Sequence, residues 1–431
     1  MSAARTLFVN AGQVVTCAGP ARARVGAEMR DAVIRTGVAV LVEGDTIVSV
    51  EQESTLVAAP ASAGADMIDC HGGLLTPGFV DSHTHAIFGR ARYEEQELRA
   101  AGVGYMEIAR RGGGNHASVR DLRGRSADEL FALALPRLRA LAASGVTTVE
   151  VKSGYGLTLD DELKTLRVIQ RLAAELPMRI VPTWLGAHEI PLEFRERGPA
   201  GRREYIDLLV HAMLPVVARE RLARFADIFC EPGVFTVAES REILGAALAH
   251  GLQIKLHADE LEAGGAAELA AELRATSADH LAAVSDAGIA ALAGAGTVAT
   301  LLPGTMLFLG KDRQAPARDL IAAGVPVALA TDFNPGTSPT TNFPLVLTLG
   351  VSQLRLSVAE VMVAGTVNGA AALRLAGDVG QLAPGFSADL ALWDATDVRE
   401  LPYWYGAGRC RASWTRGKPC HVHDLALAFP S

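Results

Sequence analysis

The sequence predicts an α/β protein with a (β/α)8 barrel and a small β-sandwich domain formed from both chain termini. Short apolar runs alternate with amphipathic stretches through the middle of the chain, which is typical of βα units repeated around a parallel sheet. Both ends hold short β-type segments separated by turn signals. A chain of 431 residues also exceeds one small core, so we expect one large domain and a smaller companion.

The two ends of the chain share the same β-rich pattern. Residues 5–16 and 37–52 contain runs of Val, Ile and Leu interrupted by Gly-Gln and Gly-Asp, and residues 388–393 continue in this manner near the C-terminus. We therefore expect the two ends to meet in one composite domain. The predicted boundaries are 1–75 and 376–431 for the β-sandwich and 76–375 for the barrel.

The middle of the chain supplies eight strands, with helices between most of them. Each strand is a short apolar run, and each helix repeats apolar residues at intervals of three and four. The segment between the first two strands is unusually long and is expected to carry extra loops over the active site. The strands are expected at 78–83, 146–152, 179–186, 225–230, 253–258, 276–279, 297–302 and 326–331. The helices are expected at 127–143, 160–176, 202–223, 237–250, 262–273 and 284–294.

Composition argues against several classes of partner. A net charge of −8 argues against nucleic acid, and no uninterrupted apolar run is long enough for a membrane span. The apolar segment Leu7–Val9 is too short for the core of a signal peptide. Five cysteines without a CxxC pair favour reduced thiols, so we expect a cytoplasmic protein.

Histidines and acids gather where the predicted strands end. The first strand runs into His83-Thr84-His85, and because alternate strand residues share a face, the two imidazoles can bind one metal ion. An isolated pair of this kind is equally often part of a half-exposed strand. In a (β/α)8 barrel, however, the C-terminal strand ends form the active site, and most of the relevant residues converge there. These strand-end residues are His83, His85, His188, His257, Glu260, His280 and Asp332.

Four of these residues are assigned as metal ligands. His83, His85, His257 and Asp332 offer three nitrogens and one carboxylate, which suits one Zn or Fe ion per chain with a position left for water. A metal-bound water becomes acidic enough to supply hydroxide near neutral pH, and Asp332 is placed to accept its proton.

Two further residues are assigned to acid–base catalysis beside Asp332. His280 would stabilise a developing oxyanion or relay a proton, and Glu260 would pass a proton to a leaving nitrogen. The alternative for Glu260 is a loop anchor or a partner of a ligand, and the alternative for His280 is a purely structural role.

A two-metal site is the competing arrangement. Such a site usually needs a bridging anion on the fourth strand, which here ends in Phe229-Cys230-Glu231 and has no lysine to carry a carboxylate bridge. Lys152 closes the second strand and is expected to be a polar neighbour of the site. We therefore expect one metal, with Glu231 as the residue able to support a second.

An arginine and two tyrosines form a candidate carboxylate clamp. Arg92 and Tyr105 lie in the long segment after the first strand, and Tyr155 follows the second strand. A guanidinium with phenolic hydroxyls can hold a carboxylate. The alternative is that Arg92 simply pairs with Glu94 or Glu95 at the surface.

These motifs together resemble the amidohydrolase superfamily over about residues 74 to 375. The histidine pair with a distant His and Asp is typical of the whole superfamily, whereas Lys152–Gly156 and Asp332–Gly336 are more specific. The matching stretches are Asp81–His85, Tyr105–Ile108, Gly112–Gly114, Val146–Leu157, Gly186–His188, Phe229–Glu231, His257–Glu260, Ser277–His280, Leu301–Thr305 and Ala330–Pro339.

The resemblance implies hydrolysis of the ring C–N bond of 4-imidazolone-5-propanoate to N-formimidoyl-L-glutamate, in histidine degradation. It implies a homodimer, and the same four ligands for Zn or Fe. Asn115–Ser118 depart from the pattern that follows the triple glycine, so the contacts of that loop are not carried over. The substrate- and product-binding residues that it implies are Arg92, Tyr105, Tyr155, His188, Glu260, Asn334, Gly336 and Thr337.

Two other functions remain open at this point. A metal-dependent deaminase of a purine, pyrimidine or related ring would use the same metal and acid–base residues, because both reactions add water to an sp2 carbon. Such an enzyme would not need the clamp of Arg92, Tyr105 and Tyr155. A metal-free barrel acting as an interaction protein is the other reading, and it is disfavoured because all four ligands are present.

Overall fold

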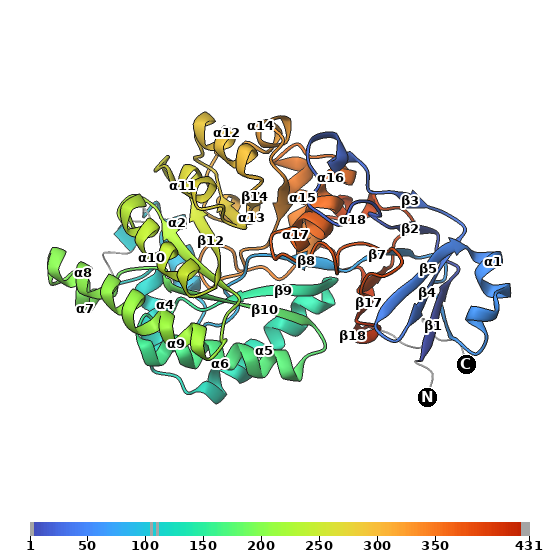
Figure 1. Cartoon of the computed structure of the whole chain (residues 1–431), viewed down its shortest axis with the longest axis horizontal. Coiled ribbons are helices and arrows are strands. Elements are labelled where there is room, and N and C mark those ends of the chain that lie inside the picture. The colour runs from blue at the N-terminus through green and yellow to red at the C-terminus, as the bar shows by residue number, and fades with distance from the viewer. Residues whose placement is uncertain (1–3, 104–106, 109–111, 424–431) are drawn as a thin grey trace.

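The computed structural model describes residues 4–103, 107–108 and 112–423, and it consists of a barrel with a β-rich unit at one end. Figure 1 shows the N-terminal strands beside the last strands of the chain, on the side of the barrel away from the helices α7 and α8. The predicted fold class, a (β/α)8 barrel with a sheet unit built from both ends, is confirmed.

All eight predicted barrel strands are present, and they are parallel in chain order around one sheet. The first and last named strands are shorter than predicted, because their backbones leave the regular ladder before the site residues. The strands are β8 (Phe79–Asp81), β9 (Val146–Lys152), β10 (Arg179–Ala187), β11 (Phe225–Cys230), β12 (Gln253–Ala258), β13 (Ser277–His280), β14 (Val298–Leu301) and β15 (Val327–Leu329).

The helices between these strands follow the sequence prediction with two corrections. The segment predicted as one helix at 202–223 is α8 (Gly198–Leu208), a π-helical turn η3 (Leu209–Met213) and α9 (Leu214–Arg219). Pro215 cannot donate a backbone hydrogen bond and its ring crowds the preceding turn, so the helix widens there. The other predicted helices are α5 (Ala127–Ala143), α6 (Leu159–Glu175), α10 (Val237–Ala249), α11 (Ala266–Glu272) and α12 (Asp286–Ala295).

The second correction concerns the start of α11, which lies four residues after the predicted start at 262. The Asp259 carboxylate accepts backbone N–H groups from Gly264, Ala266 and Ala267, at 2.8, 3.2 and 3.0 Å. Gly265 is left-handed, with a φ of 82°. The segment before Ala266 is therefore a loop held by an acid from the end of β12, next to the predicted catalytic residues.

The remaining helices lie in the segments of the chain that follow β8, β10, β14, β15 and β16. Two of them, α2 (Tyr93–Ala100) and α4 (Asn115–Arg123), lie in the long segment after β8, as expected. The others are α7 (Leu192–Arg195), α13 (Pro303–Phe308), α14 (Ala317–Ala322), α15 (Phe343–Ser352), α16 (Val358–Val363), the π-helical turn η4 (Ala364–Asn368), α17 (Gly369–Ala371) and α18 (Glu400–Tyr403).

The two chain ends form two sheets. One has the order β5-β4-β1-β6, and the other has the order β18-β17-β16-β7-β2-β3, so the second joins N- and C-terminal segments. Their shared core includes Phe8 and Trp414, whose ring centroids are 4.9 Å apart. The first sheet is β1 (Arg5–Val9), β4 (Val38–Glu43), β5 (Thr46–Gln52) and β6 (Asp66–Asp69). The second is β2 (Gln13–Val15), β3 (Ile34–Arg35), β7 (Leu74–Pro77), β16 (Leu390–Trp393), β17 (Cys410–Thr415) and β18 (Lys418–Val422). Short helices η1 (Gly26–Arg30), α1 (Glu53–Ala58) and η2 (Pro60–Ser62) connect these strands.

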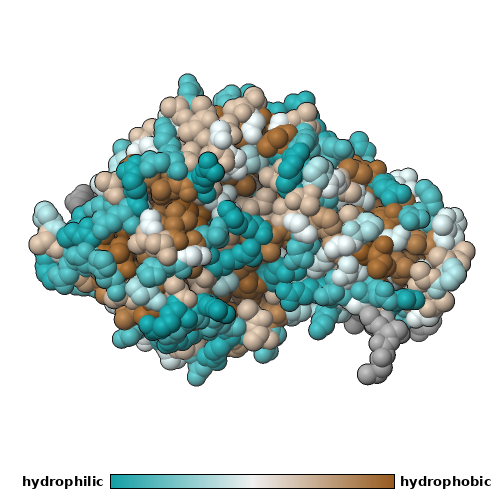
Figure 2. All heavy atoms as spheres, viewed as in Figure 1, coloured by the Kyte–Doolittle hydropathy of each residue, from teal (hydrophilic) through white to brown (hydrophobic). Residues whose placement is uncertain are grey.

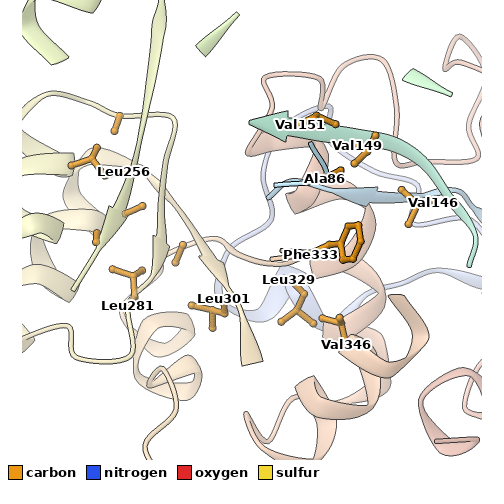
Figure 3. Close-up of a cluster of buried hydrophobic side chains, with 14 of the residues drawn as sticks. Ala86, Val146, Val149, Val151, Leu256, Leu281, Leu301, Leu329, Phe333 and Val346 are labelled. Carbon is orange, nitrogen blue, oxygen red and sulfur yellow. The ribbon is translucent and has the colours of Figure 1, made fainter. Parts of the chain in front are cut away.

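Apolar and charged residues alternate along the barrel strands. Val149 and Val151 of β9 belong to the apolar cluster drawn in Figure 3, together with Leu256 of β12. Glu150 and Lys152, between and after the two valines, are fully buried and ion-paired. Because successive strand residues face opposite ways, one face of the sheet is apolar and the other carries charge.

The surface of this view is mostly hydrophilic, with separated hydrophobic patches (Figure 2). No helix among residues 4–103, 107–108 and 112–423 is long and apolar enough to cross a membrane.

Candidate metal centre and active site

The structure brings the four predicted metal ligands together. The Nε2 atom of His85 lies 3.3 Å from Nε2 of His83 and 3.3 Å from Nε2 of His257. Oδ1 of Asp332 lies 3.6 Å from Nε2 of His83 and 3.5 Å from Nε2 of His85. Bonds of about 2.0–2.1 Å to a zinc ion separate neighbouring ligand atoms by about 3.0–3.6 Å when a fifth position is left for water, so these contacts fit one such ion.

The closure of the barrel produces this arrangement. Beyond β8 and β15, the His85 N–H donates to the Phe333 carbonyl at 2.8 Å, and the Asp332 N–H donates to the His83 carbonyl at 3.0 Å. These bonds set the end of the first strand beside the end of the last. The Thr305 hydroxyl donates to Oδ2 of Asp332 at 2.6 Å, which leaves Oδ1 facing the imidazoles.

Two of the imidazoles have a carboxylate behind them. Nδ1 of His83 donates to Oδ2 of Asp279 at 2.6 Å, and Nδ1 of His257 lies 3.1 Å from Oδ2 of Asp227. A proton on Nδ1 leaves the Nε2 lone pair free for a metal. Burial, and then the nearby charge of Lys152, holds the pKa of His83 well below its usual value, so the ring is neutral, as a ligand must be.

Two of the three residues assigned to acid–base catalysis, and the residue before the third, have an unusual backbone conformation. His280 and Asp332 have positive φ values of 77° and 51°, and so does Asp259, directly before Glu260, at 47°. Such conformations cost energy in residues other than glycine and concentrate at functional sites, where the surrounding structure enforces them. Here they occur where β12, β13 and β15 end.

Glu260 and His280 face each other across the cavity, with Oε2 of Glu260 3.6 Å from Nδ1 of His280. Burial, and then the negative charges of Asp332 and Glu231, raises the pKa of Glu260 well above its ordinary value. The raised pKa favours the protonated carboxyl, which is the form able to donate a proton. The ligand atoms of His83, His280 and Asp332 also lie within 4.8 Å of one another, so His280 borders the metal centre.

Glu231, the residue considered for a second metal, has another role. Its carboxylate accepts the backbone N–H groups of Glu260, Leu261 and Glu262 at 3.0, 3.1 and 2.8 Å. Among the residues that the structure describes, the groups able to hold a metal do not include Glu231. This residue holds the loop that carries Glu260.

Arg92 lies at the start of α2 and is buried. Its Nη1 atom donates to Oδ1 of Asn115 at 3.2 Å and to Oγ of Ser118 at 3.3 Å, and its Nε atom lies 3.4 Å from Oε1 of Glu95. The departure from the family pattern at residues 115–118 thus supplies partners for Arg92. A Cβ at Gly336 would lie 1.7 Å from Nη2 of Arg92, so a side chain at this position would displace the guanidinium.

His188 and Tyr155 stand beside the ligands. Nδ1 of His188 donates to the Gly154 carbonyl at 2.9 Å, which leaves its Nε2 as an acceptor, and the Asn115 amide lies 3.4 Å from that atom. The His188 ring is stacked on His85 at 5.1 Å, and the Tyr155 ring lies 5.2 Å from His188. Burial lowers the pKa of His188 to about 3, so the ring stays neutral.

The loop after β15 is organised by Asn334. Its Oδ1 accepts the N–H groups of Gly336 and Thr337 at 2.8 and 2.7 Å, while its Nδ2 donates to the Asp332 carbonyl at 2.7 Å. This loop therefore links Asp332, a predicted metal ligand, to the wall that packs against Arg92.

Most of the predicted site residues line one cavity of about 1030 Å³. His83 lies behind it, fully buried, and Gly336 does not line it. Tyr105 falls outside the described residues. The predicted residues that line the cavity are His85, Arg92, Tyr155, His188, His257, Glu260, His280, Asp332, Asn334 and Thr337.

Sequence reasoning gave no role to several residues that hold the site. Thr305, Asp227 and Asp279 contact Asp332, His257 and His83, and Asn115 contacts Arg92 and His188. Asp227 and Asp279 are charged residues within otherwise apolar strands. Because charges are seldom buried without a partner, this pattern could have indicated that each contacts a residue of the site. Nothing in the local sequence singles out Thr305.

A cluster of histidines and an aspartate at the C-terminal ends of the strands of a (β/α)8 barrel is the arrangement expected of a metal-dependent hydrolase. The model of the amidohydrolase family matches residues 96–420, and the chain belongs to this family. Its relatives include the imidazolonepropionase of Symbiobacterium thermophilum, 47% identical over 415 residues that cover 96% of each chain. The imidazolonepropionase of Geobacillus thermodenitrificans is 44% identical over 418 residues, covering 96% of this chain and 97% of the relative.

Solved structures share the fold at lower identity. An amidohydrolase from an environmental sample of the Sargasso Sea has a TM-score of 0.69 at 21% identity, covering 97% of this chain and 93% of that one. An adenosine deaminase from Xanthomonas campestris has a TM-score of 0.67 at 18% identity, covering 99% of this chain and 96% of that one. These likenesses concern the architecture alone.

Proposed function

We propose that this protein hydrolyses the ring C–N bond of 4-imidazolone-5-propanoate, giving N-formimidoyl-L-glutamate in the degradation of L-histidine. The observation that carries the proposal is that a cluster of potential metal ligands and the buried Arg92 border the same cavity. Full-length similarity to imidazolonepropionases supports the choice of substrate. The cyclic amide would lie over the cluster, with its propionate toward Arg92.

We propose His83, His85, His257 and Asp332 as ligands of one Zn or Fe ion per chain. When bound, such an ion lowers the pKa of a coordinated water to about 7 and polarises a carbonyl. Nδ1 of His83 donates to Asp279, and Nδ1 of His257 lies 3.1 Å from Asp227, so the Nε2 atoms of both rings are left to face a divalent ion.

The acid–base steps are assigned to three residues. Asp332 takes the proton of the attacking water, whose oxygen forms a bond to the ring carbonyl carbon. His280, at the edge of the metal centre, stabilises the negative charge that develops on the carbonyl oxygen. The ring C–N bond then breaks, and Glu260 donates a proton to the leaving nitrogen, a role that its raised pKa favours.

Substrate recognition is assigned to the cavity wall. Arg92 binds the propionate, with Tyr155 and Tyr105 in support. His188 accepts a hydrogen bond from a ring N–H through Nε2, since its Nδ1 already donates to Gly154. The remaining contacts are assigned to Thr337 for the substrate and to Asn334 and Gly336 for the product.

Turnover of the imidazolone with metal analysis on the same sample tests the proposal. We expect purified protein to consume 4-imidazolone-5-propanoate, followed by its absorbance, with one metal ion per chain. His257→Ala should lose most metal and most activity, because three remaining ligands hold zinc far less well. Two metals per chain would contradict the single-ion site. Turnover of a purine or pyrimidine amine instead of the imidazolone would favour a ring deaminase.

We further propose a cytoplasmic homodimer that binds neither nucleic acid nor membranes. The dimer is based on family resemblance alone, and the cytoplasmic location on cysteine content. Light scattering of the purified chain at several concentrations tests the dimer, and a monomer at all of them would contradict it.

A further inference from the structure

The interior of the barrel below the metal centre is charged. In a (β/α)8 barrel, branched apolar side chains normally fill this space. Here three carboxylates surround two ammonium groups, and all five side chains are 0% exposed. We call them the interior charge network: Glu150 and Lys152 on β9, Asp227 on β11, Lys255 on β12 and Asp279 on β13.

Lys152 forms one half of this network. Its Nζ atom lies 2.7 Å from Oε2 of Glu150 and 2.7 Å from Oδ2 of Asp227. The same Oδ2 atom lies 3.1 Å from Nδ1 of His257. The Asp227 oxygen is therefore held between a lysine and a metal ligand.

Lys255 forms the other half. Its Nζ atom donates to the Ser82 carbonyl at 2.6 Å and lies 3.2 Å from Oε2 of Glu150 and 3.4 Å from Oδ2 of Asp279. That Asp279 oxygen accepts the Nδ1 proton of His83 at 2.6 Å. Glu150 contacts both lysines and so joins the two halves.

We propose that Lys152 and Lys255 are positioning residues of the metal centre. Each holds a carboxylate against the Nδ1 atom of a ligand, and so fixes which nitrogen of His257 or His83 faces the metal. This inference rests on the proposed metal centre and deepens it, because it concerns how the ligands are kept ready rather than which reaction follows.

The physical reason is the crowding of like charge in a dry interior. Three carboxylates converge where water cannot screen them, and they stay together only because the ammonium groups lie between them. Without Lys152, Asp227 would be repelled by Glu150 and would turn away from His257. The imidazole would then lose the acceptor that sets its ring orientation, and partners of this kind are worth about 10- to 100-fold in metal affinity.

The competing explanation is that the network only joins neighbouring strands. Zinc affinity separates the two explanations, because it does not require turnover and is independent of the substrate. The affinity of the metal-free full-length chain for Zn²⁺ is measured by competition with a chromophoric chelator, and Co²⁺ absorption reports the ligand geometry. Lys152→Met should raise the Zn²⁺ Kd by about 10- to 100-fold and change the Co²⁺ spectrum.

Arg179→Met is the matched control. Arg179 lies on β10, is mostly buried, and pairs with Asp378 at 3.0 Å, away from the metal ligands. The Arg179→Met substitution should lower the unfolding temperature of the metal-free protein and leave the Zn²⁺ Kd and the Co²⁺ spectrum unchanged. If Lys152→Met behaves as this control does, the positioning role is wrong.

A comparison of two further variants extends the test to the case in which Lys152→Met is insoluble. Asp227→Asn leaves two carboxylates with two ammonium groups. Asp227→Asn/Lys152→Met leaves two carboxylates with one ammonium group, the same excess of one carboxylate as in the wild type, so both variants are expected to fold. Because Lys152 acts through Asp227, adding Lys152→Met to Asp227→Asn should change the Zn²⁺ Kd by less than about threefold. A further loss of about tenfold or more would overturn the proposal. Loss of imidazolone turnover with normal zinc binding would instead count against the proposed function.

Discussion

Arg92 is the residue on which the proposed choice of substrate depends most directly. Its guanidinium is buried in the cavity wall and already contacts Asn115, Ser118 and Glu95, so it is oriented before any ligand arrives. Its neighbour Arg90 instead pairs with Glu94 at the surface. The surface pairing considered for Arg92 thus applies to Arg90, while Arg92 forms a buried pair with Glu95.

Arg92→Ala should lower kcat/KM for the imidazolone by about 30- to several-thousand-fold, because truncating a desolvated carboxylate partner costs about 2–5 kcal/mol. Arg92→Lys should recover part of this loss, since an ammonium cannot make the planar paired contact. Metal content should stay constant. Kinetics are measured on the imidazolone and on an analogue without the carboxylate.

Arg90→Ala is the control for Arg92→Ala and should cost less than about 1 kcal/mol. Equal slowing of both substrates by Arg92→Ala would show that the arginine does not bind the propionate.

His116 makes stability depend on pH. Burial, and then the positive charge of Arg195, lowers the pKa of His116 from 6.5 to about 4. Between these pH values the unfolded chain binds a proton that the folded chain refuses, so this residue reduces stability as the pH falls from 6.5 to 4. In His116→Gln, the unfolding temperature should therefore fall less over that range than in the wild type. Parallel curves for the two proteins would contradict the shifted pKa.

At the scale of elements, the loop after β12 depends on an acid from the neighbouring strand. Glu231 accepts three successive backbone N–H groups of that loop, and Asp259 caps the start of α11. Glu260 therefore takes its position from two carboxylates rather than from its own strand. The sequence alone indicates only that Glu231 is an acid at the end of the fourth strand, which is also compatible with support for a second metal.

Glu231→Gln should lower kcat by about 10- to 100-fold with one metal ion still bound, because a small displacement of a catalytic group is costly. The amide can accept fewer hydrogen bonds from the loop than the carboxylate does. Turnover and elemental analysis are compared with Glu242→Gln, a surface variant on α10 that should behave as the wild type. A loss of metal in Glu231→Gln would restore the bridging role considered for this residue.

At the scale of the whole molecule, the sheet that spans both chain ends covers one side of the barrel. Strands β7 and β16 pair in antiparallel register from Leu74 with Trp393 to Pro77 with Leu390. The Trp393 indole donates to the Thr76 hydroxyl at 2.9 Å, and its ring lies 5.3 Å from that of Phe79 at the start of β8. The C-terminal segment thus contacts both the composite sheet and the first barrel strand.

Deleting residues 380–431 should give insoluble protein, because it exposes the apolar faces of β2 and β7 and the wall around Phe79. Solubility and turnover are compared with a deletion of residues 424–431, which leaves every named strand in place. A soluble, active protein lacking 380–431 would show that the barrel does not need the C-terminal strands.

The sequence by itself determined the barrel strands and the metal cluster. Apolar alternation marks which residues face the core, and the ends of parallel strands must meet at one edge, so His83, His257 and Asp332 could be placed together without coordinates. The π-helical turn before Pro215 was not predicted, because a proline within an amphipathic pattern is compatible with several local structures.

Tertiary structure alone decided which partners these residues have. Asp279 reaches His83, Lys152 reaches Asp227, and Gly336 leaves room for Arg92, although each pair is distant in the chain. Such contacts follow from the closure of the barrel, which selects one neighbour for each buried charge from many that are chemically equivalent. Periodicity shows the direction in which a side chain points, whereas the identity of its partner depends on the packing of the whole chain.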